Sequence, residues 1–242
     1  MSAIFGPAGN AESFPYKSSA DAPKWLKEIG LDCYEYQCGK GVHVGEATAR
    51  RVGAAAVEHG IALSLHAPYF INLANPDPQA LQKTIGYITG ACRVADWMGA
   101  ARVVIHSGAL MGRTRREALD IALGSLKEVI ASCDGEGFGH LTLCPETMGK
   151  INQLGDLDEV LELFLELDAD DAQLDCPFVY ASAKTGVASM DSDGNGANME
   201  PLFETIVDYI PAPEGDPEAG TQVLISTIDY NEYVGRIGIG KV

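Results

Sequence analysis

The sequence predicts an α/β fold in which parallel strands alternate with helices, and three observations support this prediction. Three apolar runs lead into His66, His106 and Glu146, which lie 40 positions apart (106 − 66 and 146 − 106). Apolar runs of this length, bounded by Gly, Pro or Asn, are typical of buried parallel strands. The segments between them have helical spacing of apolar residues. A strand–helix–strand unit needs roughly 30 or more residues, so each step holds one unit.

The first part of the chain divides into about five such units. Strands are predicted at 3–6, 33–37, 62–65, 103–105 and 141–145. Helices are predicted at 22–29, 46–59, 78–98 and 115–131, with a fifth opening at Asp156, a good N-cap residue. Pro78 suits the first turn of its helix. Because a closed barrel needs eight units, the predicted fold class is a partial TIM-like (β/α) barrel.

The pattern changes after about residue 160. A short strand is predicted at 177–181, a polar, Gly-rich loop at 185–197 and a helix at 199–210. The Pro-rich segment 211–217 cannot continue that helix. Alternating residues over 221–229 and 233–242 predict a C-terminal β-hairpin. The partial barrel is therefore followed by a strand–helix piece, a linker and a hairpin, which do not continue a βα barrel.

The charge distribution also separates two parts. The chain has a net charge of −17. Residues 1–150 contain 14 Lys and Arg and 15 Asp and Glu, whereas residues 151–242 contain 3 Lys and Arg and 19 Asp and Glu. The nearly neutral part could approach a polyanion, which the acidic part would repel. No apolar stretch approaches the ~20 residues of a membrane span, and no signal peptide is visible. The six cysteines form no CxxC pair. We therefore expect a cytoplasmic protein without a membrane partner.

The residues at the three strand ends predict a metal site. Parallel strands place their carboxyl ends at one edge, where a (β/α) barrel builds its active site. Two imidazoles and a carboxylate suit zinc or a similar ion, and Glu146 is a candidate catalytic residue. The alternative is that His66, His106 and Glu146 are polar strand-end residues satisfied by backbone groups. Arg113, Arg115 and Arg116 could contact phosphates or form a solvated helix start.

The first part contains three distinctive segments, which are LHAPYFINLANPDP (65–78), VVIHSGAL (103–110) and LCPETMGKINQLGDLDEV (143–160). Together they resemble the endonuclease IV (type-2 AP endonuclease) family of xylose-isomerase-like barrels. The resemblance implies a zinc-dependent hydrolase that cleaves DNA 5′ to abasic sites in base-excision repair. His66 and His106 would bind one zinc, Glu146 would bridge it to a second, and Tyr69 and Asn72 would approach DNA.

The chain departs from this family after Glu146. The family takes its remaining ligands from strands six to eight, and no histidine follows Glu146 here. We therefore expect one zinc ion at most, and impaired phosphodiesterase activity.

The second part contains the segments LELDADDAQLDCPFVYASAKTG (165–186), MEPLFETIVDYIPAPEGDP (199–217) and TQVLISTIDYNEYVGRIGIGKV (221–242). These segments resemble the TypA/BipA translational GTPases. By resemblance, Ser182, Ala183 and Lys184 form the guanine-contacting motif. The phosphate loop GxxxxGK[ST] and the NKxD motif are absent, so this part is expected to bind no GTP.

The chain is therefore interpreted as a chimera of two parts, a barrel fragment fused to a GTPase fragment, which together form three segments. Residues 1–160 form the partial barrel, 161–211 the end of a GTPase domain, and 212–242 the linker and the start of a translation-factor β-barrel. The leading hypothesis is a zinc-dependent phosphodiesterase acting on DNA with abasic sites. The alternatives are a ribosome-associated translation-factor fragment without catalysis and a fusion without function. The oligomeric state is left open.

Overall fold

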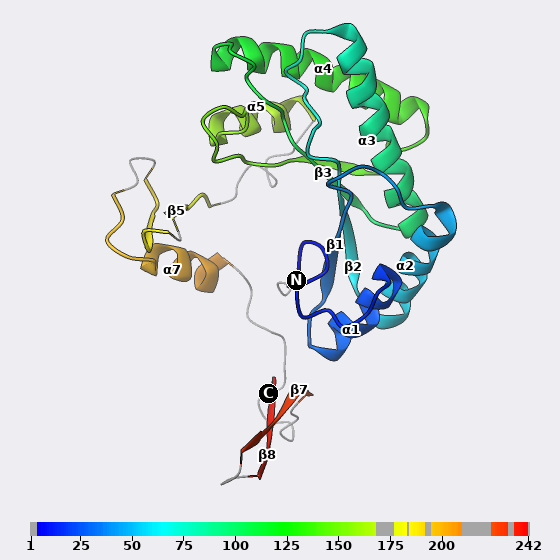
Figure 1. The fold of residues 1–242 in the computed structure, drawn as a ribbon. Helices are drawn as coiled ribbons and strands as arrows, with labels where there is room; N and C mark the ends of the chain where they lie inside the picture. The colour runs from blue at the N-terminus through cyan, green and yellow to red at the C-terminus, as the bar shows by residue number, and fades with distance from the viewer. Residues whose placement is uncertain are drawn as a thin grey trace. The chain divides into compact units, whose positions relative to one another are not determined.

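The computed structural model describes residues 4–167, 177–182, 184–191, 195–209, 224–231 and 235–241. The chain divides into two compact units, residues 5–169 with 223–242 and residues 1–4 with 170–222. The first unit contains a four-stranded parallel sheet with helices along its outer side (Figure 1). This arrangement confirms the predicted α/β fold and partial barrel, and the four strands do not close on themselves.

Strands and helices alternate along this unit in the predicted order. The strands are β1 (Cys33–Gln37), β2 (Ala62–His66), β3 (Arg102–Ile105) and β4 (Thr142–Pro145), and they are neighbours in that order. Each strand is parallel to the next. The helices are η1 (Ser19–Asp21), α1 (Ala22–Glu28), α2 (Glu46–His59), α3 (Pro78–Met98), α4 (Arg115–Gly135) and α5 (Leu157–Glu166). The four strands β1 to β4 therefore present their carboxyl ends at one edge.

Local signals in the sequence define the helix ends. Gly60 and Gly99 adopt the left-handed conformation and end α2 and α3, as glycine does readily. Asp77 caps α3 by accepting a hydrogen bond from the Gln79 backbone. Thr114 and Glu117 form a reciprocal capping box at the start of α4. These caps satisfy backbone groups that the helix itself leaves unpaired.

The core lies between the sheet and its helices. Leu65, Val103 and Ile105 point outward from the strands and are fully buried, as are Ile88 of α3 and Leu126 of α4. Because successive strand residues point to opposite faces, the inner face carries polar groups instead. Ser64, for example, donates a hydrogen bond to Glu35 on that face. The apolar outer face packs the sheet against the helices. The inner face and the carboxyl edge are therefore available to carry polar, functional side chains.

The first predicted strand, 3–6, differs from the structure. Residues 1–3 lie outside the described residues, and the segment after them pairs irregularly with β1. The Asp32 amide donates to the Phe5 carbonyl, and the Gly9 amide donates to the Glu35 carbonyl. Pro7 has no amide hydrogen, so the segment cannot form a regular ladder.

The second unit contains β5 (Tyr180–Ser182), β6 (Val187–Ser189) and α7 (Glu200–Tyr209). β5 and β6 are antiparallel. The prediction of a loop over 185–197 is wrong where it covers β6. Ala188 in that strand is buried, and its amide donates to the Asn198 carbonyl. The predicted helix at 199–210 is confirmed by α7, whereas the predicted linker, 211–217, lies outside the described residues.

The predicted C-terminal hairpin is confirmed by β7 (Leu224–Asn231) and β8 (Gly235–Lys241). Their residues pair in antiparallel register from Leu224 with Lys241 to Asn231 with Gly235, with one irregularity between Ile225 and Thr227. A hairpin of this kind does not extend a parallel barrel sheet.

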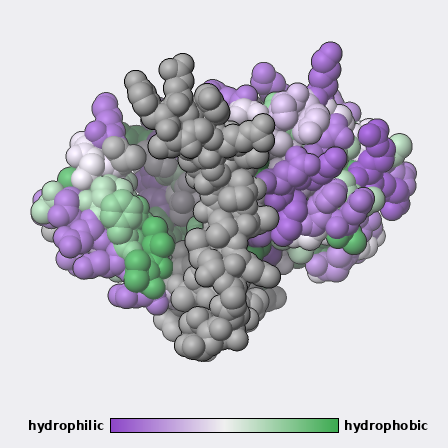
Figure 2. Space-filling model, turned by 90° about the horizontal axis from the view of Figure 1, so that it is seen from below, coloured by the Kyte–Doolittle hydropathy of each residue, from purple (hydrophilic) through white to green (hydrophobic). Residues whose placement is uncertain are grey.

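On the face that Figure 2 shows, the part of the first unit in view carries mainly hydrophilic residues, and hydrophobic residues gather on the side of the view where α7 lies. In α7, Phe203 is 59% exposed and Val207 is 76% exposed. Within the described ranges, no helix combines the length and the apolar character that crossing a lipid bilayer requires.

Candidate metal centre

Three neighbouring strands deliver the predicted ligands to one edge of the sheet. His66 ends β2, His106 follows β3 and Glu146 follows β4. The Glu146 amide continues the ladder by donating to the Ile105 carbonyl at 2.9 Å. The register pairs His66 with Val104 and Ile105 with Pro145. By this register His106 lies beside Glu146, and His66 lies two residues before the position beside His106. Because side chains alternate between the faces of a sheet, an offset of two keeps all three side chains on the same face.

The three side chains converge on a single carboxylate oxygen. Glu146 Oε2 lies 3.0 Å from His66 Nε2 and 2.9 Å from His106 Nε2. The two imidazole rings are nearly perpendicular, with centroids 5.0 Å apart. The side chains of His66 and His106 are 10% and 14% exposed, whereas that of Glu146 is 42% exposed. The two histidine side chains therefore lie at the buried end of the site, and Glu146 lies at its solvent-exposed end.

The donor set fits a cation of the zinc type. His66 Nδ1 lies 2.7 Å from the Ala67 carbonyl oxygen, which can only accept a hydrogen bond. Nδ1 therefore carries a hydrogen, and where Nε2 carries none its lone pair is turned toward Glu146. Two lone pairs at 3.0 Å repel unless a proton or a metal ion lies between them. The three possible ligand atoms lie within 4.8 Å of one another, and tetrahedral zinc holds its ligands about 3.3 Å apart.

Tyr69, a predicted substrate-binding residue, lies beside these histidines. Its ring stacks near His106 with centroids 6.5 Å apart and an angle of 27° between the planes. The ring packs so closely on Gly39 that a Cβ atom at that position would overlap it. Tyr69 is 50% exposed. It is thus held at the edge of the metal centre while one face remains available to a ligand.

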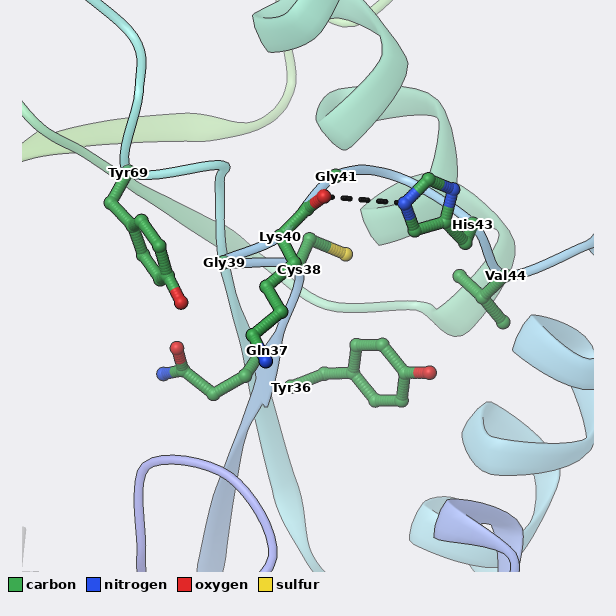
Figure 3. A pocket seen from close by; sticks show the side chains of 9 residues that line it. All are labelled: Tyr36, Gln37, Cys38, Gly39, Lys40, Gly41, His43, Val44 and Tyr69. Carbon is green, nitrogen blue, oxygen red and sulfur yellow. Dashed lines mark hydrogen bonds between the residues drawn. The ribbon is translucent and has the colours of Figure 1, made fainter.

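A cavity of about 370 Å³ opens next to Tyr69. It is lined by the end of β1 and the following loop, and Figure 3 shows the Tyr69 hydroxyl and the Gln37 amide turned toward each other. His43 Nε2 lies 3.2 Å from the Lys40 carbonyl oxygen and holds the loop (Figure 3). The lining is mixed, because it combines apolar groups such as Val44 and the Tyr36 ring with the exposed cation Lys40.

Asn72, the other predicted substrate-binding residue, joins the loops after β2 and β3. Its Oδ1 accepts hydrogen bonds from the Ala74 and Ala109 amides at 3.0 and 3.2 Å. It also lines a smaller cavity of about 130 Å³ together with Tyr69, His106 and Gln153. Asn72 therefore lies at the predicted edge, where its side-chain oxygen is occupied by backbone groups.

The predicted guanine-contacting motif lies in the β5–β6 turn. Ser182 ends β5, and its carbonyl accepts a hydrogen bond from the Gly186 amide at 2.9 Å. Lys184 is exposed in the turn. Ala183 lies outside the described residues.

Two residues near the metal centre were not singled out from the sequence. Gln37 ends β1 and pairs in register with His66, so the strand-end argument that identified the histidines could also have found it. Gln153 lies in the loop before α5 and lines the cavity beside His106. No local signal predicts that position, because it depends on how two loops meet.

Comparisons with known proteins agree with the fold of the first unit. The family described as "Xylose isomerase-like TIM barrel" matches residues 23–175. D-psicose 3-epimerase from Clostridium cellulolyticum is 16% identical with a TM-score of 0.52, over 66% of this chain and 56% of that chain. 3-keto-D-glucoside 4-epimerase from E. coli is 15% identical with a TM-score of 0.52, over 67% and 65%. Endonuclease IV from Thermus thermophilus is 17% identical with a TM-score of 0.46, over 65% and 56%.

A second similarity involves an unrelated protein. "Large ribosomal subunit assembly factor BipA" of Bacillus subtilis (strain 168) is 54% identical over 86 residues, and its counterpart in Escherichia coli (strain K12) is 50% identical over the same length. These residues are 36% of this chain and only 14% of each relative. Both resemblances seen in the sequence, to xylose-isomerase-like barrels and to BipA, are therefore confirmed.

Proposed function

Because the chain belongs to the xylose isomerase-like TIM barrel family, we propose that its first unit is a zinc-dependent phosphodiesterase fragment of the endonuclease IV type, acting on abasic sites in DNA. The observation that supports this most is the convergence of His66 Nε2 and His106 Nε2 on Glu146 Oε2. The solved epimerase structures are under 25% identical and show the fold alone. The choice of phosphodiester chemistry comes from the segments around these three residues.

The proposed mechanism assigns each residue a distinct task. His66, fixed through Nδ1 by the Ala67 carbonyl, and His106 would hold the ion together with Glu146 Oε2. Bound zinc supplies Lewis acidity, which lowers the pKa of a coordinated water and polarises a phosphoryl oxygen. With Oε2 directed at the histidines, the second oxygen of the half-exposed Glu146 carboxylate would be left to accept a proton from an attacking water. Tyr69 presents its exposed ring face to a sugar or base, and Asn72 holds the loop on which the substrate rests.

The incomplete ligand set predicts slow catalysis. Catalytic zinc commonly has three protein ligands and one open position, so these residues suffice for one ion. Two-metal sites stabilise both the attacking and the leaving oxygen, whereas the three candidate ligands would hold a single ion. Phosphodiester cleavage is therefore expected to be weaker than in a complete site.

Incision of an abasic-site duplex tests this function. With zinc added, the full chain is expected to cut 5′ to the abasic site slowly, while an undamaged duplex of the same sequence stays intact. Glu146→Gln should lower the rate at least about 100-fold, because it removes both a ligand and a proton acceptor. Gel analysis of end-labelled DNA measures the products. A chain that retains no zinc and leaves the abasic duplex uncut would contradict the proposal.

A second candidate function is binding to the large ribosomal subunit through the BipA-like segment. It is favoured by the 54% identity over 86 residues and by the exposed apolar residues of α7, such as Phe203 and Val207. We propose that the two ancestral segments meet within α5, near the predicted boundary at residue 160, and that residues 161–211 and 212–242 derive from the translation factor. A cytoplasmic location follows from either function.

Co-sedimentation with purified large ribosomal subunits tests this candidate. We expect the full chain to pellet with the subunits equally with and without GTP, because the phosphate loop is absent from the sequence. The double substitution Phe203→Ser with Val207→Ser should reduce the pelleted fraction. Failure to pellet would remove this candidate, and failure of the incision test as well would favour a fusion without function.

A further inference from the structure

We propose that Arg115 and Glu159 form a positioning pair that holds the loop carrying Glu146 against the loop that follows His106. Because the pair acts on Glu146, its consequence for metal binding presupposes the proposed metal site. The pair lies outside the metal centre, and neither residue contacts the three ligands in the structure as described. Its role is to fix the position of one of those ligands, Glu146.

The pair joins α4 to α5 through a bidentate salt bridge. Arg115 Nε donates to Glu159 Oε1 at 2.7 Å, and Arg115 Nη2 donates to Glu159 Oε2 at 2.8 Å. Glu159 is buried, with 5% of its surface exposed. Burial raises the pKa of Glu159, but the hydrogen bonds from Arg115 and from the Gly155 and Asp156 amides together outweigh it, so the pKa is lowered. The carboxylate is therefore charged at neutral pH and held at a defined place.

The same two side chains bind the backbone of the loop between β4 and α5. Arg115 Nη1 donates to the Ile151 carbonyl, and Nη2 donates to the Gln153 carbonyl, each at 3.2 Å. Glu159 Oε2 accepts hydrogen bonds from the Gly155 and Asp156 amides at 2.7 and 2.9 Å. One guanidinium and one carboxylate thus satisfy four backbone groups of a segment without regular structure.

This loop is in turn connected to both metal-binding strand ends. The Met148 amide donates to the Gly155 carbonyl at 2.7 Å, and Met148 is two residues from Glu146. The Leu154 amide donates to the Gly108 carbonyl at 2.8 Å, and Gly108 is two residues from His106. Releasing Gly155 and Gln153 would therefore loosen the backbone that keeps Glu146 beside the histidines.

The geometry requires arginine rather than a simple positive charge. A guanidinium presents several donors in a planar fork, whereas an ammonium is a compact point charge. Lysine at position 115 could keep a contact with Glu159 but could not reach two loop carbonyls at once. Arg116 is the matched control, because it pairs with Asp120 and Glu162 at exposed positions one residue along the same helix.

The test compares Arg115→Ala with Arg116→Ala in the full chain by two measurements. Amide hydrogen exchange without metal, read for residues 147–155, is expected to become at least about tenfold faster in Arg115→Ala, while buried α3 amides keep their rates. Zinc affinity, measured by chelator competition, is expected to fall about 10–100-fold, as it does when groups that orient metal ligands are removed. Arg116→Ala should stay within about twofold of the parent in both.

The opposite results would overturn the pair's role. Equal exchange and equal affinity in Arg115→Ala and Arg116→Ala would refute it, as would full recovery of both values in Arg115→Lys. If Arg115→Ala does not fold, Glu159→Gln serves in its place, because it keeps the side-chain shape and removes the charge. A parent chain that binds no zinc would defeat the proposed function, and the exchange measurement would still decide whether the pair holds the loop.

Discussion

Replacing His66 with alanine is expected to abolish stoichiometric zinc binding. Loss of a group that merely orients a ligand costs about 10–100-fold in metal affinity, so loss of a ligand should cost at least about 100-fold. His66 provides one of three donor atoms that lie within 4.8 Å of one another, and its orientation is fixed by the Ala67 carbonyl. Elemental analysis should show about one zinc ion per parent chain and almost none in His66→Ala.

The matched control is His140→Ala. His140 is an exposed histidine whose Nε2 lies 3.2 Å from Asp96 Oδ1, and neither residue belongs to the group of three candidate ligands. This variant should retain the zinc content of the parent. Circular dichroism should confirm that both variants keep their helices, because His66 is buried and its loss could also disturb folding. Equal zinc content in His66→Ala and the parent would show that the three residues are ordinary strand-end groups.

Replacing Gly53 with alanine is expected to destabilise the first unit by about 3 kcal/mol, near the upper end for overpacking. Gly53 is a buried position of α2, where the added Cβ would overlap the backbone carbonyl of Met98 at the end of α3. A backbone atom cannot rotate away as a side chain can, so the two helices would have to separate. Urea unfolding followed by circular dichroism measures the change in free energy.

Gly124→Ala provides the control for helix propensity. Gly124 lies in α4, and beyond its chain neighbours and the backbone of its own helix no atom lies within 4 Å of the position that a Cβ would occupy. Alanine favours a helix over glycine by about 0.8–1 kcal/mol, so this variant should be more stable than the parent. The same gain in helix propensity acts at Gly53. The difference in unfolding free energy between the two variants therefore isolates the cost of the steric overlap with Met98. A Gly53→Ala variant as stable as Gly124→Ala would refute close packing of α2 on α3.

The sequence by itself determined the alternation of strands and helices and the edge at which the candidate ligands lie. α2 and α3 begin and end at the predicted residues because Pro78, Gly60 and Gly99 act through local backbone preferences. His66, His106 and Glu146 were identifiable because parallel strands share one carboxyl edge. Their spacing of one strand–helix unit was visible without any knowledge of packing.

Only the tertiary structure decided how the loops at that edge are held. Arg115 was expected either to contact phosphates or to lie in solvent, yet it binds Glu159 and two loop carbonyls 36 to 44 positions away. Tertiary contacts likewise made β6 a strand and Phe5–Gly9 an irregular segment. Caps and strand ends depend on neighbouring residues, which the sequence displays directly. Contacts between loops depend on how the strands stagger and where the helices lie, so they become visible only when the chain has folded.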